Sequence, residues 1–127
     1  MAARKRILLL DDSAIALELT QAALEERGYE VVAAPNLAEF RRQLGQFRPD
    51  LVLTDLEMPD TSGKEVIRSL KQGLGTDRIP VILFSSRPDA ELARIALASG
   101  ADGHLSKANG IERLGEMVDE LVGSILW

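Results

Sequence analysis

The sequence of 127 residues contains no cysteine. A fold built from it cannot depend on disulfide bonds, and a metal ion cannot be held by thiolates. Cysteine-free chains suit a reducing compartment. We therefore expect a cytoplasmic protein whose polar sites are built from oxygen and nitrogen groups alone.

Long apolar runs and an excess of basic residues are also missing. The basic segment 1–6 leads into only four apolar residues before two aspartates follow, which is too short for a signal peptide or a membrane span. The formal net charge is −5, which argues against nucleic-acid and anionic-membrane partners. Repeats, low-complexity tracts and linkers are absent, so we expect one domain over residues 1–127.

Short apolar runs alternate with segments of helical spacing. The runs are typical of strands that are covered on both faces of a parallel sheet. Five such pairs predict an α/β protein with a doubly wound parallel sheet. The strands are expected at 7–10, 31–34, 51–53, 81–84 and 104–105, and the helices at 14–27, 37–46, 63–72, 88–99 and 110–126.

Two features of these helices can be tested. A capping residue followed three positions later by an acidic residue marks a helix start, and the spacing of apolar residues predicts the buried face. The start signals are Asn36 with Glu39, Ser62 with Glu65, Asn109 with Glu112 and, more loosely, Ser86 with Asp89. The predicted buried face of the first helix consists of Ile15, Leu19, Ala22 and Ala23, and that of the last of Ile111, Leu114, Val118, Leu121, Val122 and Ile125.

Polar residues follow the predicted strands at the ends where ligands bind in open α/β sheets. They are Asp11 and Asp12 after the first strand, Asp55 after the third, Ser85 after the fourth and Lys107 after the fifth. Clustered carboxylates need a cation, and an all-oxygen site suits Mg²⁺. A carboxylate can also attack phosphorus, while an ammonium and a hydroxyl hold the phosphoryl oxygens. Taken singly, the aspartates are equally typical of turns and helix caps.

The order of these residues resembles the receiver domains of two-component response regulators, of the CheY-like single-domain type. The matching stretches are ILLLDDS at 7–13, PDLVLTDLEMPDTSG at 49–63, PVILFSS at 80–86 and GADGHLSK at 100–107. The resemblance implies a flavodoxin-like (βα)5 fold with strand order 2-1-3-4-5. It also implies phosphorylation on Asp55, Mg²⁺ bound by Asp11, Asp12, Asp55 and the Glu57 carbonyl, and phosphate contacts from Ser85 and Lys107.

The same resemblance implies a switch protein that catalyses only its own phosphorylation and dephosphorylation. Its phosphodonor would be a histidine kinase or a phosphotransfer protein, and its output the binding of a downstream protein. The chain ends soon after the fifth helix, so we expect no output domain, although it can also be a piece of a longer hybrid kinase or regulator. The alternatives are a pseudo-receiver that acts without phosphorylation and a flavodoxin relative that binds a nucleotide. A nucleotide-binding relative would need a Gly- or hydroxyl-rich phosphate loop after the first strand, and this sequence has acidic residues there.

Two positions depart from the family pattern. Ala108 stands where the family usually has a proline in a cis peptide, and His104 stands where it has the aromatic ring that moves inward on activation. A cis bond before a residue other than proline costs about 2.5–4 kcal/mol, so we predict a trans peptide with Lys107 still reaching the site. His104 is either the switch residue or a partly exposed side chain without a role.

Glu57 and Arg87 each stand two residues beyond a site residue, Asp55 and Ser85. They are predicted to flank the path of the water that hydrolyses a phosphoaspartate, and to tune its lifetime by pairing. The alternative is two solvated loop charges. The fourth helix either packs only against the sheet or faces a partner, and the end segment 125–127 with Trp127 either covers the core or docks a partner.

Overall fold

The computed structural model describes residues 4–125, which form one five-stranded parallel sheet in the order β2-β1-β3-β4-β5. The strands are β1 (Arg6–Leu10), β2 (Glu30–Ala34), β3 (Leu51–Asp55), β4 (Val81–Ser85) and β5 (Gly103–Ser106). Each strand extends a little beyond the apolar run that predicted it. The predicted α/β class and strand order are confirmed.

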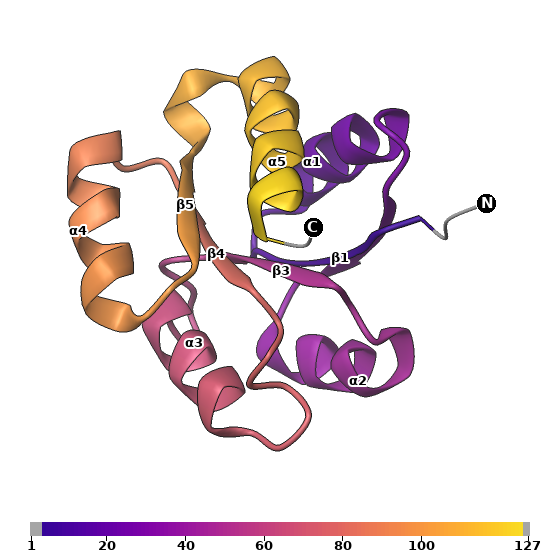
Figure 1. The fold of residues 1–127 in the computed structure, drawn as a ribbon, viewed down its shortest axis with the longest axis vertical. Coiled ribbons are helices and arrows are strands. Elements are labelled where there is room, and N and C mark those ends of the chain that lie inside the picture. The colour runs from indigo at the N-terminus through magenta and orange to yellow at the C-terminus, as the bar shows by residue number, and fades with distance from the viewer. Residues whose placement is uncertain (1–3, 126–127) are drawn as a thin grey trace.

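Helices follow the strands in alternation, and they cover both faces of the sheet. They are α1 (Ala14–Glu26), α2 (Leu37–Phe47), α3 (Gly63–Gln72), α4 (Asp89–Ser99) and α5 (Ile111–Ile125), with a short 3-10 helix η1 (Lys107–Asn109) before α5. Figure 1 shows α1 and α5 together on one face, α2 and α3 on the other, and α4 beside β5. None of the helices within residues 4–125 has the length and apolar character to cross a membrane.

The core has two halves, because successive strand residues point to opposite faces of the sheet. In β1, Ile7 and Leu9 pack with α1 and α5, whereas Leu8 and Leu10 pack on the side of α2, α3 and α4. All four side chains are buried. This two-sided burial explains why the strands appear in the sequence as continuous apolar runs.

Two of the predicted helix starts are confirmed. The side chains of Asn36 and Ser62 accept hydrogen bonds from the main-chain N–H groups of Glu39 and Glu65, at 2.9 and 3.3 Å. Ser13, which the sequence argument did not use, caps α1 in the same way by accepting from the N–H of Ala16. Each cap satisfies an N–H group that the first turn of a helix leaves without a partner.

The other two predicted starts are wrong. Asn109 belongs to η1 and donates its side-chain amide to Asp89, so α5 begins only after Gly110, at Ile111. Ser86 does not cap α4, whose first residue follows Pro88 and has no side-chain cap. Gly110 separates Asn109 from α5, and Arg87 and Pro88 separate Ser86 from α4.

The predicted buried face of α1 is also wrong. Ile15 and Leu19 are 72% and 57% exposed, and the helix instead buries Leu17, Thr20 and Leu24. The exposed and the buried residues both fit helical periodicity. The buried face was not recognised because it includes the polar residue Thr20. The prediction for α5 holds at Leu114, Val118 and Val122, with Leu121 and Ile125 packed beside them, while Ile111 is exposed. The positions 126 and 127, including Trp127, lie outside the described residues.

Gly63 brings the start of α3 directly against the end of β3. A methyl group at this position would lie 2.7 Å from the carbonyl oxygen of Asp55 and 2.8 Å from the side chain of Leu83. The main-chain N–H of Gly63 donates to the carbonyl of Leu56 at 2.8 Å. Gly63 therefore permits a close approach of the two backbones and positions the loop that follows Asp55.

We predict that Gly63→Ala lowers the free energy of unfolding by about 1–3 kcal/mol, because backbone atoms must move to admit the methyl group. Gly45→Ala is the matched control. It lies on the exposed side of α2 with nothing within 4 Å of the added carbon, and it should stabilise the fold by about 0.5–1 kcal/mol. Urea unfolding measures both, and equal effects of the same sign would contradict this account of Gly63.

Candidate functional site

Three carboxylates meet where β1 and β3 end. Asp11 and Asp12 follow β1, Asp55 ends β3, and the strands pair in parallel with Leu10 opposite Thr54. One oxygen from each carboxylate lies within 4.8 Å of the other two. The predicted convergence of these side chains at one edge of the sheet is therefore present in the fold.

Lys107 reaches this cluster from the end of β5, the edge strand of the sheet. It begins η1 directly after β5, and β4 separates β5 from the strand that carries Asp55. Its ammonium nitrogen lies 2.5 Å from Oδ2 of Asp11 and 3.6 Å from Oδ1 of Asp55. The ammonium also lies 4.7 Å from the ring centroid of Phe84, whose face attracts a cation. The sequence did not predict this role of Phe84, although Phe84 lies opposite Asp55 in the β3–β4 register and directly before Ser85.

Main-chain groups orient the acids. Oδ1 of the buried Asp11 accepts from the N–H of Ser13 at 3.0 Å, and Oδ1 of Asp55 accepts from the N–H of Leu56 at 2.9 Å. The hydroxyl of Thr54 donates to the carbonyl of Asp55 at 3.0 Å. The loops after β1 and β3 therefore hold the two carboxylates in fixed directions.

Burial raises the pKa of Asp55 above its ordinary value. Lys107 opposes this shift, Asp11 adds to it, the hydrogen bond from Leu56 opposes it, and Asp12 adds a smaller increase. The net shift is upward. Burial thus outweighs the ammonium, and a further positive charge beside Asp55 would favour its ionised form.

The donor set fits a hard divalent cation. Asp11, Asp12 and Asp55 offer carboxylate oxygens, which Mg²⁺ prefers over nitrogen or sulfur, and three negative charges against one ammonium leave the charge that such an ion would balance. The side chain of Glu57 is not part of this group, since it pairs with Arg87. The ligand role expected of Glu57 concerns its main-chain carbonyl and stays a prediction.

A buried serine joins the two loops beside Lys107. The hydroxyl of Ser106 donates to the carbonyl of Arg87 at 2.8 Å and accepts from the N–H of Ala108 at 3.2 Å. The described residues contain no cis peptide, so the bond between Lys107 and Ala108 is trans, as predicted. Alanine supplies an N–H that proline lacks, and Ser106 gives it a partner. Ser106 was missed, although its place directly before Lys107 could have indicated it.

Ser85 and Arg87 line the same edge. Ser85 is buried at the end of β4, and its hydroxyl accepts from the N–H of Arg87 at 3.3 Å. The guanidinium of Arg87 pairs with Glu57, as predicted, and also with Glu91 of α4 at 2.5 Å. The Arg87 and Glu57 side chains are 39% and 68% exposed, so the pair lies at the surface of the site.

His104 is half-buried on β5. It pairs with Leu83, which packs in the half of the core that includes α4, while its neighbour Leu105 packs toward α1 and α5. His104 therefore points to the α4 side of the sheet. Its expected role as a switch residue stays a prediction.

Comparisons with known proteins agree with this geometry. The response regulator receiver domain family matches residues 7–119, and the chain belongs to it. The chain is 38% identical over 121 residues to a gliding motility regulatory protein of Myxococcus xanthus, and 36% identical over 103 residues to the phosphate regulon transcriptional regulatory protein PhoB of Pseudomonas aeruginosa. These matches cover 94% and 81% of this chain but only 16% and 45% of the relatives.

Solved structures give the same result. The receiver domain of a signal transduction histidine kinase from Syntrophus aciditrophicus is 32% identical, with a TM-score of 0.81 over 95% of this chain and 92% of that one. A CheY-like receiver domain protein from Methanospirillum hungatei is 27% identical, with a TM-score of 0.82 over 96% of each chain. The chain therefore shares both the fold and the family of receiver domains, as its sequence pattern predicted.

We predict that Asp55→Asn stabilises the protein at neutral pH when divalent cations are chelated, because it removes a desolvated charge beside two other carboxylates. A carboxyl whose pKa is higher in the folded than in the unfolded state stabilises the fold fully below the unfolded pKa, and this contribution is lost as the pH rises through the folded pKa. The advantage of the variant should therefore grow with pH and vanish in acid. Asp77→Asn, in an exposed loop, is the control for net charge. Melting curves across pH measure the effect, and a variant that melts at or below the parent at neutral pH would refute it.

Proposed function

We propose that this protein is a phosphoaccepting switch of a two-component system, in which Asp55 takes a phosphoryl group. A carboxylate oxygen of Asp55 attacks phosphorus in line with the bond to the donor, the new P–O bond forms as that bond breaks, and the leaving group departs with its electron pair. The product is a mixed anhydride on Asp55. The protein supplies positioning and charge for this step, and it catalyses only its own phosphorylation and dephosphorylation.

One observation carries this proposal, namely the carboxylate cluster with the ammonium of Lys107 at 2.5 and 3.6 Å from Asp11 and Asp55. Mg²⁺, when bound by Asp11, Asp12, Asp55 and the Glu57 carbonyl, would supply positive charge for the phosphoryl oxygens. The ammonium of Lys107, on a flexible four-carbon stem, would leave Asp11 for a phosphoryl oxygen. The intact cluster gives no support to the alternative of a phosphorylation-independent module.

Ser85 and His104 take the remaining roles. The hydroxyl of Ser85, one residue beyond the strand position opposite Asp55, would donate to a phosphoryl oxygen. His104 would respond on the α4 side of the sheet. The phosphodonor would be a histidine kinase or a phosphotransfer protein, and the phosphorylated state would change the affinity for a downstream protein. The names of the relatives support a regulatory role of this kind, since PhoB is a transcriptional regulatory protein.

Incubation with a small phosphodonor such as acetyl phosphate and Mg²⁺ tests the proposal. Intact-mass analysis should show one added phosphoryl group on the parent protein, and no adduct after Asp55→Asn or when Mg²⁺ is chelated. Asp77→Asn should be modified as the parent is. A metal-dependent adduct that persists in Asp55→Asn would assign the phosphorylation to another residue.

The lifetime of the phosphorylated state should depend on the pair of Glu57 and Arg87 at the site surface. Arg87→Ala is predicted to speed dephosphorylation, because it opens the path of the attacking water and frees the Glu57 carboxylate. An exposed ion pair contributes about 0.2–1 kcal/mol, and a tenfold rate change needs about 1.4 kcal/mol. The acceleration should therefore be several-fold and should not affect whether phosphorylation occurs.

The decay of the phosphorylated mass after removal of the donor measures this lifetime. Arg94→Ala is the control, since it removes an exposed arginine of α4 for which the structure shows no ion pair with the described residues. The two loop charges are without a role in hydrolysis if Arg87→Ala and Glu57→Ala both decay at the parental rate.

A further inference from the structure

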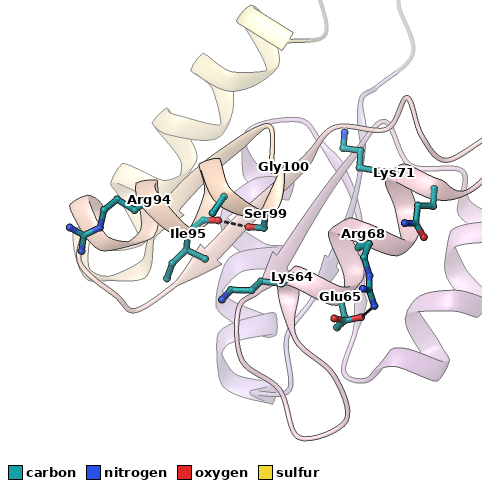
Figure 2. A pocket seen from close by; sticks show the side chains of 10 residues that line it. Lys64, Glu65, Arg68, Lys71, Arg94, Ile95, Ser99 and Gly100 are labelled. Atoms are coloured by element: carbon teal, nitrogen blue, oxygen red, sulfur yellow. Dashed lines mark hydrogen bonds and ion pairs between the residues drawn. The ribbon is translucent and has the colours of Figure 1, made fainter.

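A groove of about 670 Å³ runs between α3 and α4, outside the carboxylate site. Figure 2 shows its walls, with Lys64, Glu65, Arg68 and Lys71 on α3 and Ile95 and Ser99 on α4. The α3 wall extends from Lys64 to Gln72, and eight helical steps of 1.5 Å give it a length of about 12 Å. This is an elongated surface that can hold about two turns of another helix.

Positive charge dominates the groove although the whole chain carries −5. Lys64, Arg68 and Lys71 recur at helical spacing along α3, Arg94 adds a fourth cation from α4, and Glu65 is the acidic residue among the lining side chains. Such a local excess of one sign attracts ligands of the opposite sign.

Two of these cations are already paired within the chain. Arg68 pairs with Glu65 at 2.5 Å, and Lys71 with Asp102 at 2.8 Å. Lys64 and Arg94 have no ion pair with any residue in the range 4–125. In Figure 2, Lys64 extends from α3 toward α4, whereas Arg94 turns outward along the rim. Both are available to an acidic ligand.

The α4 wall between these cations contains an apolar strip formed by Ile95 and Ala98. Ala98 is exposed and Ile95 is half-buried. A small polyanion would leave this strip in water, whereas an amphipathic helix covers such a strip with its apolar ridge and meets the flanking cations with acidic side chains. The combination of length, charge and apolar strip therefore fits a peptide segment.

The groove also adjoins a cavity beside the loop that follows Asp55. A second cavity, of about 230 Å³, is lined by Leu56, Glu57, Ser62 and Arg87, and Lys64 and Ile95 line both cavities. The residue directly after Asp55 and the Glu57–Arg87 pair thus share a wall with the groove. A ligand in the groove lies next to the loop that phosphorylation would disturb.

We propose that the groove between α3 and α4 docks an acidic amphipathic helix of the downstream protein. The identity of the partner as a downstream protein rests on the proposed function. The docking surface itself does not, because its residues lie outside the carboxylate cluster. Apolar side chains of the incoming helix would contact Ile95 and Ala98, and its Asp and Glu residues would pair with Lys64 and Arg94.

Selection from a phage library of helical peptides against the unphosphorylated protein tests the proposal. We expect the selected peptides to be rich in Asp and Glu and to carry apolar residues three or four positions apart. Fluorescence anisotropy then measures their affinity for the parent, for the double variant Lys64→Glu/Arg94→Glu, and for the control Arg41→Glu/Arg78→Glu, whose exposed arginines lie outside the groove. The groove variant should bind at least about tenfold more weakly, equivalent to about 1.4 kcal/mol, and the control as the parent does.

The proposal is overturned if no peptide is enriched, if the groove variant keeps the parental affinity, or if the control loses as much affinity as the groove variant. The groove variant should still be phosphorylated on Asp55 by acetyl phosphate. Peptide binding by a parent protein that fails to be phosphorylated would refute the proposed function and leave the docking surface in place.

Discussion

Three carboxylates at one edge of a parallel sheet repel one another, and the ammonium of Lys107 is the main charge that the fold sets against this repulsion. The lysine directly follows β5, the strand at the edge of the sheet, so its contact with the cluster needs β1, β3, β4 and β5 in their observed order. The complete site therefore depends on four of the five strands. Burial, with a smaller contribution from the neighbouring acids, keeps the pKa of Asp55 above its ordinary value. Three carboxylate oxygens beside one ammonium also form a donor set that suits a divalent cation.

Arg87 connects the loops around this charge centre. Its side chain pairs with Glu57 after β3 and with Glu91 at the start of α4, and its main-chain carbonyl accepts from Ser106 at the end of β5. Arg87 therefore contacts three segments at the edge of the sheet that carries Asp55. The same residue lines the cavity that joins the α3–α4 groove, so the site and the proposed docking surface have a physical connection through packed side chains.

The sequence was informative where one interaction dominates. Continuous apolar runs predicted the first four strands because both faces of the sheet are covered, whereas the fifth was placed mainly by its position in the alternation. The acids were predictable because parallel strands end at the same edge. The buried face of α1 was not predictable, because the exposed pair Ile15 and Leu19 and the buried pair Leu17 and Leu24 both fit helical periodicity. The capped start of α5 was predicted wrongly because a 3-10 turn precedes the helix, next to Ser106, whose hydroxyl bonds the distant carbonyl of Arg87. Contacts between distant loops leave no periodic signal.

Tyr29 is the one tyrosine of the chain. It is buried directly before β2, and its hydroxyl donates to Asp119 of α5 at 2.7 Å, while Arg27 pairs with the other oxygen of that carboxylate at 3.0 Å. Burial and the neighbouring carboxylate raise the pKa of Tyr29 well above its ordinary value. The folded protein therefore keeps this phenol protonated under alkaline conditions that ionise the unfolded chain. The ultraviolet absorbance of tyrosinate thus becomes an intrinsic, label-free report on whether the last helix is docked against the sheet.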